Sequence, residues 1–307
     1  MNLRSESVDL HSAINALDDT NLPLEAFMGL AIAEPAQGAG GAFHLGVRVI
    51  GGGAANISDN DRQLLQQYLE TLDFIIDGGV GAPPHPELFD SEGNLIDYTG
   101  DVDSTLSARG AIITEWGLSA AGEFSLFGQS VAMGITPKLM EVRAFQQTSS
   151  VVRDFSSLSD EESHLTGNLD LGLAADLASG LRVGLAVKDV ISQDFTTNHG
   201  EEISINPRAR AGLAYIQPRY SVGLDLDLIE NKPVGFEAPV QELALGSEVK
   251  LAHWARLRLG YRADLGRSHD DAVSFGLGLR LYRFLVDVAY SRGSNHRGGA
   301  LQLGMAF

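Results

Sequence analysis

The 307-residue chain lacks cysteine and lacks any apolar run long enough to form a membrane-spanning helix. The absence of cysteine excludes disulfides and thiolate chemistry. No segment approaches the roughly 18 to 20 consecutive apolar residues that a spanning helix needs. Basic residues are also scarce, with 22 Lys and Arg against 40 Asp and Glu, giving a formal net charge of −18. Nucleic acid requires clustered positive charge, so it is not an expected partner.

Aromatic residues make up only 7% of the chain, whereas glycine is abundant at 35 residues. This balance suits closely packed strands better than a conventional aromatic-rich core. The chain opens with MNLRSE, in which no charged segment is followed by an apolar one, so no secretory signal peptide is visible. An exported form of this protein needs a signal that was removed or was missed when the start was assigned.

From Leu165 onward, apolar and polar residues alternate as in β-strands with two unlike faces. Nine strands are predicted there, at 165–177, 181–187, 208–215, 220–228, 242–251, 256–262, 273–281, 284–290 and 301–307. Five more are predicted at 24–33, 43–50, 105–116, 118–127 and 131–136, for about fourteen strands (12 to 14). The charges fall on the second face and are predicted to face a lumen: Arg208, Arg210, Asp225, Asp227, Glu248, Lys250, Arg256, Arg258, Arg262, Arg280 and Asp287.

The connections between these strands alternate in length. Short links at 178–180, 217–219, 253–255 and 282–283 alternate with longer ones at 189–207, 229–241, 265–271 and 292–299. Outer-membrane barrels have short turns on one side and long loops on the other. Aromatic residues of the apolar face gather near strand ends as in two interfacial girdles: Tyr215, Tyr220, Phe284 and Phe307 toward the short turns, and Tyr261, Phe275 and Tyr290 toward the long loops.

These patterns predict an all-β fold, an antiparallel transmembrane β-barrel in a single domain over 1–307. An even strand count places both termini on the short-turn side. By the same parity, the insertion at 51–104 is expected on the periplasmic side or inside the lumen. Within it, Ser58 followed by Asp61 resembles a capping box and the leucines from 64 to 72 have helical spacing, so a helix is predicted at 58–77.

Three patterns resemble functional motifs but favour a structural interpretation. The run Gly51-Gly52-Gly53 resembles a dinucleotide-binding turn, yet Asn56 stands where Gly or Ala is required and no strand and helix alternation follows. Residues 90–97 have roughly calcium-loop spacing, but the glycine comes two places early, which favours a turn. The eight histidines show no paired ligand spacing. No metal or cofactor is therefore expected.

Opposite charges on neighbouring strands are predicted to pair across the wall. Arg208 and Arg210 face the strand of Asp225 and Asp227, and Glu248 with Lys250 adjoins Arg256 and Arg258. Because such paired charges cancel each other, they produce only a weak electrostatic field at a permeating solute. The alternative interpretation is a selectivity lining.

An enzyme hypothesis rests on the long-loop rim, where Ser, His and Asp side chains could form a hydrolase site. The residues are His199, His269, Asp270, Ser294 and His296. Because a triad is defined by geometry, which one sequence does not supply, solvated loop residues are the favoured interpretation. No catalytic residue is predicted.

Six blocks of the second half occur in a characteristic order: GNLDLGLA at 167–174, LRVGLAVKD at 181–189, PRARAGLAY at 207–215, LDLDL at 224–228, LALGSE at 243–248 and LRLGYR at 257–262. In this order, over roughly 165–307, the chain resembles the TraF-type outer-membrane barrel family, often labelled conjugal transfer protein. The resemblance implies an architecture related to fatty-acid-transporter barrels and a link to conjugation. It supplies no catalytic residues.

The sequence therefore predicts a non-enzymatic protein of the Gram-negative bacterial outer membrane. It is either a narrow or plugged transporter of small or apolar solutes, or an assembly component of a conjugation or secretion system. Expected partners are outer-membrane lipid, the outer-membrane assembly machinery, an apolar small molecule and transfer-system proteins. The assembly signal is predicted in the last strand, at Leu301, Leu303, Met305 and Phe307. The alternatives are a barrel-embedded hydrolase and a soluble β-sandwich binding module.

Overall fold

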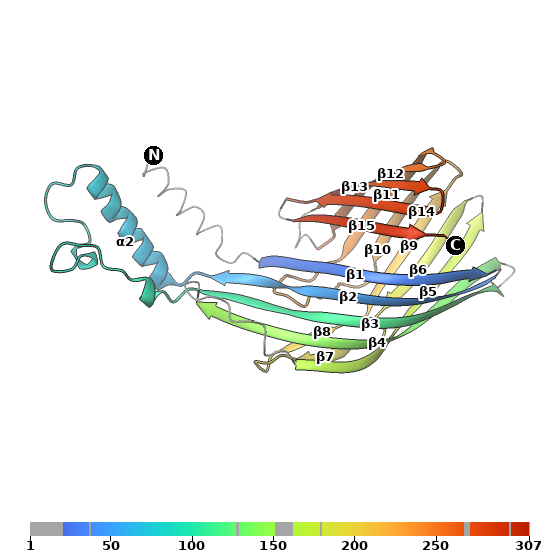
Figure 1. Ribbon diagram of the computed structural model, residues 1–307, viewed down its shortest axis with the longest axis horizontal. Helices are drawn as coiled ribbons and strands as arrows, with labels where there is room; N and C mark the ends of the chain where they lie inside the picture. The colour runs from blue at the N-terminus through green and yellow to red at the C-terminus, as the bar shows by residue number, and fades with distance from the viewer. Residues whose placement is uncertain are drawn as a thin grey trace.

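In the computed structural model, thirteen strands of the described residues form one antiparallel sheet that curls around an interior (Figure 1). The structure describes residues 21–36, 38–126, 129–150, 162–178, 180–266, 271–294 and 296–306. The sheet follows chain order through β1 (Asn21–Ala36), β2 (Ala39–Asn56), β3 (Thr105–Leu126), β4 (Gln129–Ser150), β5 (Glu162–Ala178), β6 (Leu181–Lys188), β9 (Arg208–Ile216), β10 (Tyr220–Asp227), β11 (Glu242–Ala252), β12 (Ala255–Asp264), β13 (Ala272–Leu281), β14 (Phe284–Arg292) and β15 (Arg297–Met305). The predicted all-β antiparallel architecture is confirmed.

Five of the described elements lie outside the main sheet. β7 (Gln193–Thr196) and β8 (Glu202–Ile205) pair as a separate hairpin. The helix α2 (Asp59–Ile76) and the short 3-10 helices η1 (Pro86–Leu88) and η2 (Thr99–Asp101) belong to the connection between β2 and β3. We call residues 57–104 the helical insertion. None of the described helices has the length and apolar character needed to cross a membrane.

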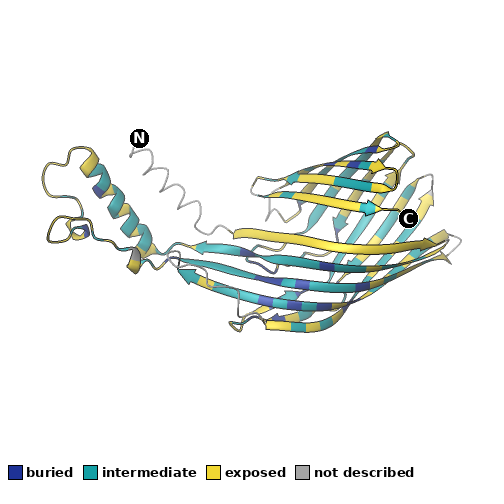
Figure 2. Ribbon diagram, viewed as in Figure 1, coloured by how far each residue is buried: buried dark blue, intermediate teal, exposed yellow. Residues whose placement is uncertain are grey.

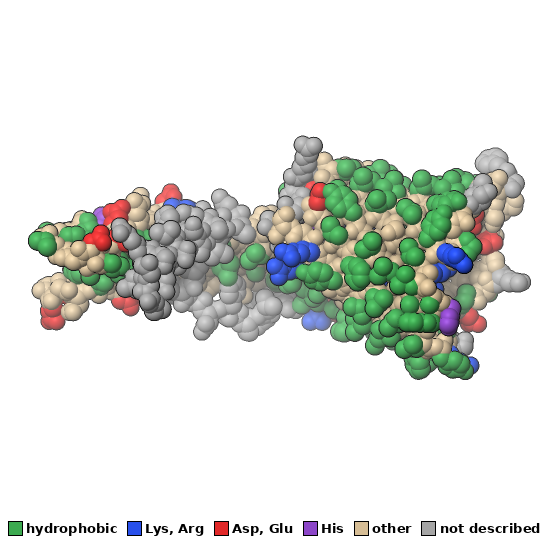
Figure 3. Space-filling model, turned by 90° about the horizontal axis from the view of Figure 1, so that it is seen from above, with side chains coloured by type: hydrophobic (Ala, Val, Ile, Leu, Met, Phe, Trp, Pro, Cys, Tyr) green, Lys and Arg blue, Asp and Glu red, His purple; other side chains and the backbone are tan. Residues whose placement is uncertain are grey.

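The outward face of the sheet is apolar. In β13, Val273 and Phe275 are 61% and 51% exposed, while the alternating Gly276 and Gly278 are buried. The same alternation of strand side chains continues through the neighbouring strands because its period is two. Figure 3 shows hydrophobic side chains spread over one outer face of the sheet.

β3 corrects the predicted strand count. Residues 105–126 form one strand, where the sequence suggested two strands separated at Gly117. Gly117 instead pairs with His44 of β2 and Lys138 of β4, and the register continues beyond it. A glycine in a strand interior weakens the strand without reversing it. Thirteen strands still fall within the expected range of 12 to 14.

Because β3 is one strand instead of two, every connection before it lies at the opposite end of the sheet from the predicted one. The helical insertion leaves β2 and enters β3 at the same end as the long connections 189–207 and 228–241, and Figure 1 shows α2 extending beyond the strand ends. The predicted even strand count would place the insertion at the short-turn end, and its assignment to the periplasmic side or the lumen stays a prediction. With an odd number of antiparallel strands, β1 begins at the long-connection end and β15 finishes at the short-turn end. An even number of strands, as predicted, would have placed these two strand ends on the same side.

The helical insertion begins at a capped helix. The Ser58 hydroxyl accepts a hydrogen bond from the Asp61 backbone N–H at 3.0 Å, which satisfies one of the free donors of the first turn. The Ser58 backbone N–H donates to the Ser104 hydroxyl at 3.1 Å rather than to Asp61 as in a full capping box, and the Asp61 carboxylate accepts the Ser104 backbone N–H at 2.6 Å. This contact closes the base of the insertion, while the Tyr68 hydroxyl donates to the Ile96 carbonyl further along.

The stability of the insertion is expected to depend on pH through His85. The His85 imidazole lies 2.8 Å from the Glu70 carboxylate, and this hydrogen bond raises the pKa of His85 and lowers that of Glu70. A raised histidine pKa gives stabilisation that is fully present below the unfolded pKa of about 6.5 and is lost as pH rises through the folded value. Amide exchange around 64–90 should therefore be faster at pH 8 than at pH 6, after correction for intrinsic rates. His85→Asn should remove the difference and His253→Asn should retain it; a difference that persists in His85→Asn would contradict the prediction.

The interior at the long-connection end has its own apolar core. The β7–β8 hairpin and the 228–241 connection turn inward against β3 and β4, and Figure 2 shows the buried residues of those long strands. The buried side chains are Ala111, Ile113, Met140, Val142, Ala144, Phe195, Ile203, Ile205 and Val234. Large apolar side chains buried on the inward face need these segments to cover them. The interior is thus filled by the chain itself at this end.

Candidate functional site

Lys138 is the centre of a buried charge network inside the sheet. Its ammonium lies 2.6 Å from the Asp189 carboxylate and 2.8 Å from that of Asp170, and its side chain is 3% exposed. Asp189 follows β6 with a left-handed φ of 53°, and its side chain is 1% exposed. Arg48 of β2 and Arg208 of β9 approach the same carboxylate at 3.8 and 3.4 Å. Strands far apart in the sheet are therefore tied together through one buried aspartate.

Two further networks continue the charges around the interior. Arg210 contacts Asp227 at 2.5 Å and Glu242 at 3.1 Å, and Arg262 contacts Glu242 at 3.1 Å. On the next strands, the charged contacts are Arg258 with Glu248 at 2.9 Å, Arg258 with Asp287 at 2.5 Å and Arg256 with Glu248 at 3.7 Å. Charge-assisted pairs of this kind are roughly twice as strong as neutral hydrogen bonds. Opposite charges consequently neutralise each other over much of the inner wall.

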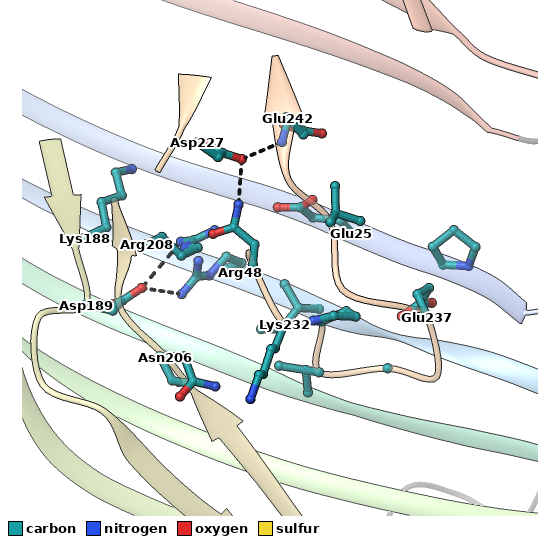
Figure 4. Close-up of a pocket in the computed structure, with 18 of the residues that line it drawn as sticks. Glu25, Arg48, Lys188, Asp189, Asn206, Arg208, Asp227, Lys232, Glu237 and Glu242 are labelled. Carbon is teal, nitrogen blue, oxygen red and sulfur yellow. Dashed lines mark hydrogen bonds and ion pairs between the residues drawn. The ribbon is translucent and has the colours of Figure 1, made fainter. Parts of the chain in front are cut away.

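A cavity of about 520 Å³ is lined by residues of the Lys138 network and of the Arg210 network. Figure 4 shows Arg48 and Arg208 extending toward Asp189, with Asp227 and Glu242 on the far side of the two arginines. The charged side chains that line it are Glu25, Arg48, Lys188, Asp189, Arg208, Arg210, Asp227, Lys232, Glu237, Glu242 and Arg262. We call this cavity the chamber. Apolar side chains such as Ile50, Ile205 and Val234 complete the lining. A wholly apolar solute would still desolvate the charges without compensating them, so the chamber better suits a ligand that carries polar groups.

The 228–241 connection forms one wall of the chamber, and we call it the strap. The Arg109 guanidinium of β3 donates to the strap carbonyls of Val234, at 3.1 Å, and Gly235, and lies 4.8 Å from the Phe236 ring centroid. Asn21 of β1 donates to the Phe236 carbonyl at 3.0 Å. A connection between β10 and β11 is therefore held against β1 and β3 across the interior.

The glycine run that resembled a dinucleotide turn has a packing role in β2. A Cβ on Gly52 would lie 2.3 Å from the Glu237 carboxylate of the strap, and a Cβ on Gly51 would lie 2.5 Å from the Arg109 carbonyl. At Gly51 the contact is with backbone, so only glycine permits this close approach of β3 to β2, whereas at Gly52 the Glu237 side chain could move aside. The calcium-like residues 90–97 form a turn, in which Asp90 accepts the backbone N–H groups of Glu92 and Asn94 at 2.9 and 2.8 Å.

The structure brings together most of the sequence-predicted charges in the three networks. The predicted neighbour pair Arg210 and Asp227 is present, whereas Arg208 pairs with Asp189 rather than with Asp225. Lys250 donates to the Pro218 carbonyl at 3.0 Å near a short turn, and Arg280 is exposed at the same end. These two residues lie away from the chamber lining.

The residues of the hydrolase hypothesis are placed only in part. His269 and Asp270 lie outside the described residues. The His296 ring lies 3.4 Å from the Arg262 guanidinium, and His199 belongs to the turn between β7 and β8. Among the described residues, no group of three or more His, Asp or Glu side chains is arranged to hold a metal ion.

Sequence reasoning missed the centre of the largest network. The predicted strand 131–136 ends before Pro137, a residue that cannot donate to a sheet ladder. β4 nevertheless continues, and Pro137 pairs with Leu169 of β5. Lys138 shares the inward face with Thr136 and Met140, so extending the alternation past the proline would have placed it in the interior.

Comparison with protein families identifies the chain. The family described as "F plasmid transfer operon, TraF, protein" matches residues 2–227, which is well over half of the sequence. The chain belongs to this TraF family. No curated protein matches it.

Several solved structures resemble the TraF-family chain in outline. The toluene transporter TbuX of Ralstonia pickettii is 12% identical, with 88% of this chain and 82% of that one covered and a TM-score of 0.45. The CymD monoaromatic hydrocarbon channel is 11% identical, with 98% and 92% covered and a TM-score of 0.44. The Pseudomonas putida toluene transporter TodX is 9% identical, with 88% and 82% covered and a TM-score of 0.41.

Proposed function

We propose that this protein is a non-enzymatic β-barrel of the bacterial outer membrane, forming a single domain whose lumen is closed by the strap. The observation that carries the proposal is the contrast between the two faces of the sheet. In β10, Leu224 is 40% exposed on the outward face, while Asp227 of the same strand is buried and ion-paired on the inward face. A protein with apolar side chains outside and charges inside fits a lipid environment.

Strand length and aromatic placement support the same location. β9 to β15 contain 8 to 11 residues each, close to the roughly 9 to 11 that cross a bilayer. Aromatic side chains of the outward face are exposed near both ends: Tyr215, Tyr220 and Phe284 toward the short turns, and Tyr261, Phe275 and Tyr290 toward the long connections. Aromatic girdles occupy these positions in barrels.

Cell fractionation tests the location. We expect the full-length protein in the outer-membrane fraction, soluble only in detergent and migrating differently on gels before and after boiling. A monodisperse protein in detergent-free buffer would overturn the proposal and favour the soluble sandwich.

We further propose that the chamber admits small polar solutes and that the strap limits their passage. The charged lining favours polar over apolar solutes, and the strap closes one side of the chamber. Apolar solutes, if they are transported, must use another route. In this proposal the ion pairs stabilise the wall of the chamber rather than select solutes. Examples are Arg208 with Asp189 and Arg258 with Asp287.

Arg109→Ala is expected to open the lumen. Hydrogen bonds to a charged group contribute about 1.5–3 kcal/mol each, and Arg109 donates to two strap carbonyls. Their loss should raise the fraction of chains with a displaced strap by about tenfold or more. Planar-bilayer conductance and liposome swelling with small sugars measure the change. Arg283→Ala, in a short turn, is the control, and equal conductance of both variants would show that the strap does not limit passage.

The last strand supports a proposed contact with the outer-membrane assembly machinery. Leu301, Leu303 and Met305 lie on one face of β15 and are 66%, 70% and 59% exposed. The fourth residue of the predicted signal, Phe307, lies outside the described residues. A second candidate role, as an assembly component of a transfer system, is favoured by membership of the TraF family.

A further inference from the structure

An apolar pocket lies on the helical insertion, well away from the chamber. It has a volume of about 420 Å³ and is lined by Phe74, Ile75, Pro83, Pro86, Phe89 and Gly93. Further apolar side chains of the insertion are exposed, including Val80 at 96% and Leu95 at 44%. A pocket with an apolar lining and an apolar surround marks a place where a side chain of another molecule can be buried.

The surroundings of this pocket are strongly acidic. Residues 57–104 contain eleven Asp and Glu residues and one Arg. Asp77 caps the C-terminal end of α2, and the last turn contains no basic residue, although the helix dipole favours a cation there. Figure 3 shows acidic and hydrophobic side chains side by side on this protruding end. The insertion that carries the pocket therefore has a large excess of negative charge.

We propose that the helical insertion binds a basic amphipathic segment of another protein. An apolar side chain of that segment enters the pocket beside Ile75, and its Lys or Arg residues face the acids around Asp77, Glu87 and Glu92. Ile75 is 49% exposed at the pocket, so it is accessible to such a segment. Charge complementarity with an apolar centre is the usual anatomy of a specific interface.

The negative charge of the insertion disfavours three other ligands for the pocket: another segment of this chain, a second copy of it and anionic lipid. Residues 1–20 contain four acids and one Arg, and residues 151–161 contain three acids and one Arg, so neither segment of this chain complements the surface. A second copy would bring the same acids together, and anionic lipid headgroups would also be repelled. The inference is independent of the membrane location, because the insertion extends beyond the strand ends.

Binding of a defined peptide tests the inference. The probe is a fluorescein-labelled Lys and Leu peptide with leucine at i, i+3, i+4 and i+7. Its anisotropy is measured with the full-length protein in phosphatidylcholine nanodiscs, or in buffer if the protein needs no lipid, and empty nanodiscs serve as the blank. We expect saturable binding that weakens with salt. The triple variant Asp77→Asn, Glu87→Gln, Glu92→Gln should bind about tenfold more weakly, equivalent to about 1.4 kcal/mol.

A matched control separates this site from general negative charge. The variant Glu123→Gln, Glu201→Gln, Glu202→Gln removes the same charge from outside the helical insertion and the strap and should bind as the wild type does. Ile75→Ser should weaken binding while circular dichroism of the protein is unchanged. Equal affinities for the two triple variants, or wild-type binding by Ile75→Ser, would overturn the proposal. So would tighter binding of a peptide of residues 1–20, because the occupant would then be part of this chain.

Discussion

Lys138→Met is expected to destabilise the folded protein by about 3–5 kcal/mol, the usual cost of removing one partner from a buried ion pair. The lysine ammonium is the closest cation to Asp189, at 2.6 Å, and both side chains are almost fully buried. Methionine fills a similar volume but leaves the Asp189 and Asp170 carboxylates without their main counter-charge. Arg48 and Arg208 lie further from Asp189 and compensate it only in part.

Urea unfolding of protein folded into phosphatidylcholine vesicles measures this loss. Lys188→Met is the matched control, because Lys188 is exposed beside the chamber and its loss should change stability by less than about 0.5 kcal/mol. The double variant Lys138→Met, Asp189→Asn should recover part of the loss, since it removes the orphaned charge as well. A cost below about 1 kcal/mol for Lys138→Met would show that the network is hydrated rather than buried.

Leu224→Arg is expected to cost about 2–4 kcal/mol if the outward face contacts lipid, because an arginine near the bilayer midplane is poorly solvated. Leu224 lies in the middle of β10, and its side chain is 40% exposed on the outward face. If that face contacted water, the same exposed substitution would change stability by only about 0.5 kcal/mol. The two environments therefore predict clearly different results.

A leucine expected at a different depth in the bilayer provides the control for Leu224→Arg. Leu228 follows β10 near the long-connection end and is 46% exposed. Leu228→Arg should cost only about 0–1 kcal/mol, since the arginine reaches the interface. Unfolding of both variants from vesicles gives the comparison, and equal small costs at the two positions would contradict a membrane-spanning sheet.

The strand pattern was predictable because it is local. Alternation assigns each side chain to one of two faces with no knowledge of the partner strand. This was enough to place Leu224 outside and to propose Arg210 opposite Asp227, which the structure places 2.5 Å apart. The helix at 59–76 was also predictable, because Ser58 and the apolar spacing are local signals.

The end at which each connection lies was not predictable in the same way. The end at which a connection lies depends on how many times the chain reverses between it and the other connections. A turn predicted at Gly117, where β3 in fact continues, therefore put the helical insertion at the wrong end of the sheet. A local error thus became a global one, although every strand near it was assigned to the correct region of sequence.

The sequence by itself determined that this chain forms amphipathic antiparallel strands with an apolar and a charged face, because side-chain alternation is a property of each strand alone. Only the tertiary structure decided that Lys138 meets Asp189 and that Arg109 holds the strap. Lys138 and Asp189 come from segments 51 positions apart in the numbering, and the strap crosses the interior to reach β3. Such contacts are set by the curvature of the whole sheet, which no single strand encodes.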